Sequence, residues 1–281
     1  MDKNQTLVNR FRVKNDTKQL EKDKVAVEEP LQIRLVQDDF SEIFSITLRT
    51  PNHDQQLAYG LLFSEGVITK SSDINSFQLE SIDSHQSANQ LTVNLAPTVS
   101  LDLSSKTRRH PSYSGCGICG KTSLQALELK QLRPPTPTSI RLTNELVKTL
   151  KLQLAKQPLF SSTGGSHVAG LIYEVNGRLD IENSPFFEDV GRHNALDKLI
   201  GHELHENNLS QVGILLLSGR IGFELVQKAV IAGFSTILAL GAPSNLAIKA
   251  ANQFNLTLVG FAKDDSFNLY TADTDPKDLL E

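Results

Sequence analysis

Apolar and polar residues alternate along several stretches of the first third of the chain. Residues 31–35, 44–48 and 90–96 each carry an apolar side chain at every second position. This alternation is typical of strands that bury one face. Residues 57–62 instead show helical spacing, so we expect a helix from about His53, capped by Asn52 and ended by Gly66. Residues 70–90 are rich in Ser and Asp and are expected to be a loop with at most one strand.

The middle of the chain reads as further helices and one hairpin. The apolar spacing predicts helices over residues 121–131 and from Thr143 or Asn144 to about Lys156. Asn176-Gly177 separates two apolar runs, 168–175 and 178–181, and this dipeptide is a strong signal for a tight hairpin turn. Another helix is expected after the segment 188–194.

The last third has the most regular organisation. Continuous apolar strands are predicted over residues 212–217, 236–240 and 256–261. Helices are expected near 222–232 and from about residue 245 to 254. Alternation of buried strands with helices is typical of a parallel, layered α/β sheet. We therefore predict an α/β fold with an α+β N-terminal part.

The same pattern also indicates how the chain is divided. Residues 1–26 are polar and mixed in charge, and they are expected to be a flexible leader. The proline-rich run 133–137 reads as a stiff linker. It divides a β-rich N-terminal part, residues 27–133, from an α/β part, residues 138–281.

Composition narrows the class of protein. The 281 residues are 39% hydrophobic and 21% charged with a net charge of −4, which describes an ordinary globular protein. The apolar runs fall short of the roughly 20 residues that span a bilayer, and the first 24 residues show no secretory signal, so we expect a cytoplasmic protein with no membrane segment. The net negative charge of the chain argues against nucleic-acid binding.

The two cysteines of the chain, Cys116 and Cys119, stand three residues apart. They are surrounded by glycines, preceded by a basic run and followed by Lys121; the residues concerned are Gly115, Gly117, Gly120, Lys106, Arg108, Arg109 and His110. Glycine leaves a sulfur atom accessible, and nearby positive charge favours the reactive thiolate. A helix beginning just after Cys119 would lower the thiol pKa further. We therefore expect sulfur chemistry in this loop.

The pair Cys-x-x-Cys admits three interpretations. A structural zinc site needs four ligands, so two of His110, His167 and His193 would have to complete it. Thioredoxin-like redox activity places the pair at the start of a helix, without this surround of glycines. The third is persulfide carriage, in which one thiolate accepts a sulfur atom and a neighbouring thiol assists its release.

Small and charged residues follow each of the last three predicted strands. They are Ser218-Gly219-Arg220, Gly241-Ala242-Pro243-Ser244-Asn245 and Phe261-Ala262-Lys263-Asp264-Asp265-Ser266. Ligands of open α/β sheets bind beyond the carboxyl ends of the strands. Arg220 and Lys263 would suit phosphate groups, and Asp264 and Asp265 a base amine or ribose hydroxyl. A nucleotide-like anion is one interpretation; ordinary connecting loops are the other.

A second polar group comes from the middle of the chain. His167 follows Gly-Gly-Ser, and Asp189, Arg192 and His193 stand at an expected helix start. They could contribute acid–base or ligand groups to a cleft. Individually, each suits a capping or packing role, and Asp189 is a candidate N-cap.

Six motifs in series resemble one family, the formate dehydrogenase accessory sulfurtransferases (FdhD-type proteins). They are Glu28-Glu29-Pro30, Arg49-Thr50-Pro51-Asn52-His53-Asp54, Gly115-Cys116-Gly117-Ile118-Cys119-Gly120, Thr163-Gly164-Gly165-Ser166-His167, Glu188-Asp189-Val190-Gly191-Arg192-His193-Asn194-Ala195 and Ser218-Gly219-Arg220. The resemblance runs from about residue 25 to 272. It implies a fold related to cytidine deaminases, a homodimer and a cytoplasmic role.

The resemblance also implies a reaction. Such proteins take sulfur from a cysteine desulfurase and pass it to the molybdenum bis(molybdopterin guanine dinucleotide) cofactor of formate dehydrogenase. Cys116 is the implied persulfide carrier, Cys119 the second thiol, and residues 261–266 the cofactor-binding segment, although Ser266 stands where the family often has a basic residue. Cys116 lacks the preceding proline of the zinc-binding deaminases, so we expect no catalytic zinc. The alternatives are a cofactor-binding chaperone without chemistry and, from another class, a zinc-dependent hydrolase.

Overall fold

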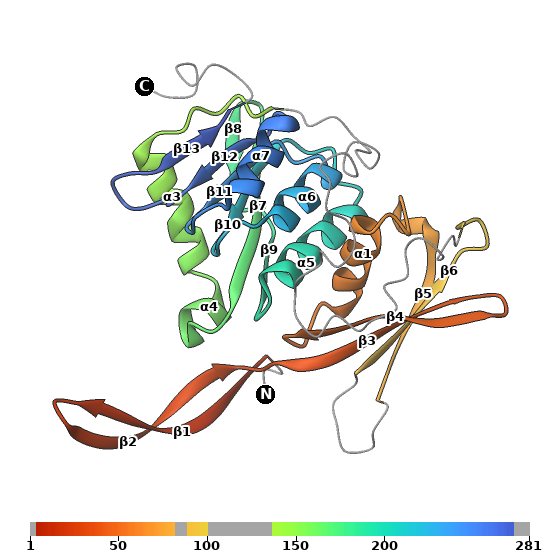
Figure 1. The fold of residues 1–281 in the computed structure, drawn as a ribbon, viewed down its shortest axis with the longest axis horizontal. Helices are drawn as coiled ribbons and strands as arrows, with labels where there is room; N and C mark the ends of the chain where they lie inside the picture. Colours follow the sequence, from red (N-terminus) through yellow and green to blue (C-terminus); the bar gives the residue numbers. More distant parts are fainter. Residues whose placement is uncertain (1–3, 82–88, 101–136, 273–281) are drawn as a thin grey trace.

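The computed structural model describes residues 4–81, 89–100 and 137–272 (Figure 1). The predicted cysteine loop, with Cys116 and Cys119, lies outside these residues. The helix predicted over 121–131 lies outside them as well.

The N-terminal sheet contains the strands that the alternating pattern predicted. It consists of β3 (Glu29–Gln37), β4 (Phe40–Arg49), β5 (Ile74–Glu80) and β6 (Gln90–Leu95), in the order β4-β3-β6-β5. A short 3-10 helix, η1 (Ser71–Asp73), precedes β5. Every second residue of β3, from Leu31 to Leu35, is at most 1% exposed. The predicted single buried face is therefore confirmed.

The expectation of a flexible leader over residues 1–26 is wrong. Two ten-residue strands, β1 (Gln5–Lys14) and β2 (Thr17–Ala26), pair along their whole length as an antiparallel hairpin. Asn15 and Asp16 make its turn with φ of 48° and 59°, a left-handed conformation that Asn and Asp tolerate. We call this hairpin the arm; it extends away from the body of the protein (Figure 1). The sequence pattern did not predict the arm, because its composition is polar and neither of its faces is buried.

The second sheet is mixed rather than wholly parallel. Its order is β13-β12-β11-β10-β7-β8, and β9 also pairs with β7. The strands are β7 (His167–Val175), β8 (Arg178–Asp180), β9 (Phe186–Asp189), β10 (Gly213–Leu217), β11 (Thr236–Ala239), β12 (Thr257–Gly260) and β13 (Asn268–Thr271). Among the described strands of this sheet, the pairs that run parallel are β10–β11 and β11–β12, as predicted. The β7–β8 hairpin turns at Asn176-Gly177 as expected, whereas β9 and β13 were not predicted.

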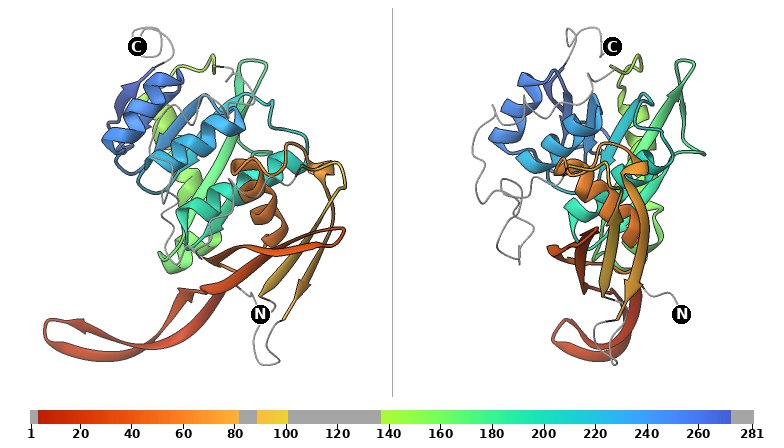
Figure 2. Two further views of the ribbon diagram at one scale, coloured as in Figure 1. Left: turned by 45° about the vertical axis from the view of Figure 1, so that its right-hand side comes forward. Right: turned by 90° about the vertical axis from the view of Figure 1, so that its right-hand side faces the viewer.

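Helices cover both faces of this sheet, which confirms the layered α/β class (Figure 2). They are α1 (Asp54–Ser64), α3 (Asn144–Ala155), α4 (Pro158–Thr163), α5 (Arg192–His205), α6 (Phe223–Ala232) and α7 (Asn245–Gln253). Buried residues of α3 pack with one set of alternating strand residues, which includes Ile214 and Leu216. Those of α1, α5, α6 and α7 pack with the other set, which includes Leu215 and Leu217. Within the described residues, no helix has the length and apolar character to cross a membrane.

Helices α1 and α5 join the two sheets through direct backbone contact. A Cβ atom at Gly60 would lie 1.9 Å from the carbonyl oxygen of Asp197, and one at Gly201 would lie 1.9 Å from that of Gln56. Only glycine permits this approach. Helix α1 begins at Asp54 after His53, which has a left-handed backbone and makes no side-chain cap bond, so the prediction that Asn52 caps the helix is wrong.

Candidate functional site

The three loops that follow β10, β11 and β12 meet at one edge of the second sheet, as predicted. The backbone N–H of Leu240 donates to the carbonyl of Leu217 at 3.0 Å, and that of Phe261 donates to Gly241 at 3.2 Å. A Cβ atom at Gly241 would lie 2.6 Å from the backbone nitrogen of Arg220. These contacts bring the first two loops into direct backbone contact and attach the third beside them.

His167 reaches the same edge because β7 runs antiparallel to β10. The Ser218 hydroxyl accepts a hydrogen bond from the Val168 N–H at 2.9 Å, which fixes the start of β7 against the end of β10. A Cβ atom at Gly219 would lie 2.9 Å from Nδ1 of His167 and 3.9 Å from Cβ of Arg192. We refer to His167, Arg192, His193 and Arg220 as the basic edge.

The two histidines of the basic edge are poor proton acceptors. Burial lowers the pKa of His167, and the neighbouring charges of Arg192 and Arg220 lower it further. Burial, reinforced by Arg192 and Lys228, lowers the pKa of His193 to about 3. His193 is therefore neutral near pH 7, and its Nε2 lies 3.1 Å from the Glu224 carboxylate, to which it can donate. The positive charge of the edge thus resides on the two arginines.

Two hydrogen-bonding atoms at this edge lack partners within the described part of the chain. They are Nε of Arg192 and the hydroxyl of Ser166, and both atoms are buried. Buried polar groups in folded proteins almost always have a partner, and an unmade bond costs roughly 1–3 kcal/mol. The arrangement suits a ligand that accepts hydrogen bonds and carries negative charge.

Asp189 holds the basic edge to the N-terminal half rather than capping a helix. Its carboxylate is fully buried and accepts hydrogen bonds from the backbone N–H groups of Thr50 and Gly191, at 3.1 and 2.8 Å. The ammonium group of Lys198 lies 2.7 Å from it and also donates to the Thr50 carbonyl at 2.9 Å. The N-cap of α5 is Gly191, so the predicted capping role of Asp189 is wrong. Its role is to position the start of α5, where Arg192 stands.

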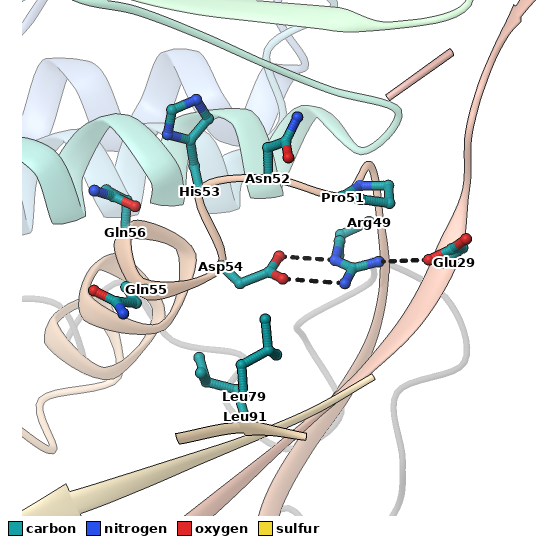
Figure 3. Close-up of a pocket in the computed structure, with 10 residues that line it drawn as sticks. All are labelled: Glu29, Arg49, Pro51, Asn52, His53, Asp54, Gln55, Gln56, Leu79 and Leu91. Atoms are coloured by element: carbon teal, nitrogen blue, oxygen red, sulfur yellow. Dashed lines mark hydrogen bonds and ion pairs between the residues drawn. The ribbon is translucent and has the colours of Figure 1, made fainter. Parts of the chain in front are cut away.

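The front motif 49–54 lines a cavity of about 300 Å³ (Figure 3). Arg49 is 1% exposed; two of its nitrogens bind the Asp54 carboxylate at 2.8 and 3.1 Å, and a third lies 3.4 Å from Glu29. Leu79 and Leu91 supply apolar lining on the opposite side. The motif therefore anchors the end of β4 to the start of α1, next to the Thr50 contact with Asp189.

The predicted cofactor-binding segment follows β12 at the same sheet edge. Ala262 is buried and its N–H donates to the Ala239 carbonyl at 3.1 Å, whereas Phe261, Lys263, Asp264, Asp265 and Ser266 are exposed. The Lys263 N–H donates to the Ser266 carbonyl at 2.8 Å and closes a turn. Asp264 pairs with Lys151 of α3 at 2.8 Å, and this contact lowers its pKa. The segment is thus correctly placed for an edge ligand, while its cofactor role stays a prediction.

Other functional positions were not predicted. Lys198 and Glu224 lie inside helices, and their roles depend on partners from other elements. The available signal for Lys198 was a pair of adjacent charged residues, Asp197 and Lys198, between apolar residues of a helical stretch. Among the described residues, no group of three or more His, Cys, Asp or Glu side chains could hold a metal ion. Both cysteines lie outside those residues, so the prediction about zinc stays open.

The sequence of the chain is similar to that of one protein family. The profile of the FdhD/NarQ family matches residues 26–275. The chain belongs to this family. It is 39% identical over 266 residues to the sulfur carrier protein FdhD of Streptomyces coelicolor, covering 92% of this chain and 91% of the relative. It is 36% identical over 263 residues to the protein of the same name from Sulfurisphaera tokodaii, covering 93% and 94%.

A solved structure supports the fold independently. The crystal structure of a protein from Desulfotalea psychrophila, described as a formate dehydrogenase accessory protein, superimposes with a TM-score of 0.68. The match covers 99% of this chain and 100% of that one at 23% identity. Together with the family match, it confirms the resemblance that the sequence motifs indicated.

Proposed function

We propose that this protein is a sulfur carrier required for formate dehydrogenase activity. Family membership and the names of the relatives support this proposal. The observation that carries it is the basic edge, where Arg192 and Arg220 gather beside two neutral histidines and leave a buried Arg192 nitrogen without a partner within the described residues. Such an edge suits an anionic sulfur acceptor, and the glycine-flanked cysteine pair in the sequence suits the sulfur itself.

The sulfur chemistry is assigned to Cys116. Its thiolate attacks the terminal sulfur of a persulfide on a cysteine desulfurase, which forms Cys116–S–SH and releases the donor cysteine as a thiolate. In the second step, the Cys119 thiolate attacks the inner sulfur of that persulfide. A Cys116–Cys119 disulfide forms, and the terminal sulfur leaves as hydrosulfide, so the electrons for its release come from Cys119. The reaction makes the protein a sulfurtransferase.

The acceptor in this proposal is the molybdenum bis(molybdopterin guanine dinucleotide) cofactor, which the protein binds as a substrate. Its phosphate groups would contact Arg192 and Arg220, since a guanidinium group forms paired, charge-assisted hydrogen bonds with phosphate. Helix α5 begins at Arg192, so its N-terminal dipole adds to the attraction. Residues 261–266 lie beside this position and would contact the guanine dinucleotide end.

The basic edge also fits the alternative of a chaperone without chemistry. The basic edge can bind an anionic cofactor by its own groups, whatever the cysteines do. The two proposals differ in one requirement: a carrier needs the Cys116 sulfur, whereas a chaperone needs only the binding surface.

Intact-mass measurement after incubation with a cysteine desulfurase and cysteine tests the carrier. We expect a Cys119→Ala variant to gain one sulfur atom that a reductant removes, and the wild-type protein to gain the same sulfur and then release it as hydrosulfide, leaving the mass of the Cys116–Cys119 disulfide. A Cys116→Ala variant that gains the same sulfur would refute the assignment. Full formate dehydrogenase activity in cells carrying Cys116→Ser would favour the chaperone instead.

A further inference from the structure

The arm carries its apolar side chains on one face. Residues that pair across β1 and β2 share a face, so Leu7, Phe11, Val13 and Leu20 lie together. These four side chains are 60–68% exposed. A two-stranded hairpin alone is at best marginally stable in water, and exposed apolar faces of this kind mark interaction sites. This face therefore suits a partner surface.

The charges on the two faces of the arm differ. The apolar face also carries Lys18, Lys22 and Lys24, and no acidic residue. On the opposite face, Arg10 forms ion pairs with both Glu21 and Asp23, so the acidic residues of the strands are matched within the arm. The partner for the apolar face should therefore combine apolar and acidic residues.

The rest of this chain has that chemistry. Residues 5–26 hold six basic and three acidic side chains, and the whole chain has a net charge of −4, so the arm carries +3 and the remainder −7. The turn between β3 and β4 exposes Asp38, Asp39 and Glu42 beside Ile43, which is 47% exposed. Arg34, which donates to Ser41, is the basic residue of this region. We call Asp38, Asp39 and Glu42 the acidic turn.

The arm cannot reach the acidic turn of its own chain. It is held at its base, where Ser162 of α4 donates to Gln5 at 3.1 Å and Gly165 approaches Ala26. From that base the arm extends in one direction, while β3 and β4 extend to the opposite side (Figures 1 and 2). Any contact between the two surfaces must therefore join two molecules.

We propose that two copies of this chain exchange arms, with the apolar, lysine-bearing face of each arm covering the acidic turn of the other copy. The exchange is reciprocal, so it closes into a two-fold dimer in which each arm occupies the same surface of its partner. A stable interface typically uses about 20–30 residues a side, and the ten residues of the arm's apolar face with the acidic turn supply part of that number. This assembly is independent of the sulfur chemistry and gives the expected homodimer a surface.

Analytical ultracentrifugation of the full chain tests the apolar contact. We expect a dimer whose dissociation constant rises about 100-fold or more in a Phe11→Thr/Leu20→Thr variant, because two large side chains lose their burial. Threonine retains strand propensity. The matched control, Val8→Thr/Val25→Thr, changes two residues of the opposite face and should remain within about threefold of the wild type.

A charge exchange tests the contact between the arm and the turn. Variant one carries Lys18→Glu, Lys22→Glu and Lys24→Glu; variant two carries Asp38→Lys, Asp39→Lys and Glu42→Lys. Each should be monomeric alone, because like charges then face each other, and an equimolar mixture should form a heterodimer with both contacts complementary. Circular dichroism confirms that each variant is folded.

Four outcomes would overturn the proposal. The first is that the wild type is found to be monomeric at high concentration. The second is that the apolar variant dimerises as tightly as the wild type, and the third is that the mixed charge variants remain monomers. The fourth is a monomer that is recruited to anionic lipid vesicles through Phe11 and Leu20, which would make the arm a membrane-binding surface.

Discussion

Substituting alanine at Gly60 or Gly201 tests the contact between α1 and α5 on which the site depends. The new Cβ atom would lie 1.9 Å from a backbone carbonyl oxygen of the facing helix, whereas ordinary contact begins at 3.4 Å. The helices would have to separate locally by about 1.5 Å, since a backbone atom cannot rotate away as a side chain can. The first turn of α5, which carries Arg192, would move with its helix.

Two opposing effects set the magnitude. Alanine in place of glycine favours a helix by about 1 kcal/mol. Overpacking a buried contact costs about 1–3 kcal/mol, and a collision with backbone belongs at or above the upper end of that range. We therefore expect Gly60→Ala and Gly201→Ala each to lower the free energy of unfolding by about 2 kcal/mol. The double variant should lose less than the sum, because the first separation relieves both contacts.

Urea unfolding followed by circular dichroism measures these differences. Lys148 is exposed in the middle of α3, so comparing Lys148→Gly with Lys148→Ala gives the helix propensity term alone. If Gly60→Ala stabilises the protein as much as that control pair predicts, the helices are not in backbone contact and the reasoning fails.

Three further predictions concern buried charge and the basic edge. Burial raises the pKa of Glu203 to about 7, so near neutral pH the folded protein holds a proton that the unfolded chain has released. Between about pH 5.5 and pH 8.5, the free energy of unfolding of the wild type should therefore fall by about 2 kcal/mol more than that of Glu203→Gln. Parallel pH profiles of the two proteins would contradict this. Lys198→Met leaves the Asp189 carboxylate buried without its counter-ion and should cost about 3–5 kcal/mol in urea unfolding; wild-type stability would show that the ion pair is dispensable. GDP serves as a probe for the guanine nucleotide end of the proposed cofactor, and Arg192→Gln should weaken its binding about tenfold or more in calorimetry. Arg178→Gln, at an exposed position on β8, should leave the affinity unchanged. Equal affinities of the two variants for GDP would remove Arg192 from the ligand site.

Local patterns predicted most of the strands and helices. The hairpin at Asn176-Gly177 and the buried face of β3 depend on neighbouring residues alone, so the sequence contained their full signal. The arm was missed because its apolar residues, such as Phe11, have no core to face in this chain. Asp189 was misjudged for the opposite reason: its partner Thr50 is 139 residues away, and only the folded chain brings the two together.

The contact between α1 and α5 also has a consequence for synthesis on the ribosome. Helix α1 ends at Ser64, but the helix that covers it ends at His205. At about 5–20 residues per second, roughly 7–28 s separate the emergence of the two. During that interval the face of α1 that α5 later contacts, which carries Gln56 and Gly60, has not yet met that helix. The N-terminal half is therefore synthesised before the helix that packs against α1, and this face of α1 is a defined surface to which chaperones of nascent chains can bind.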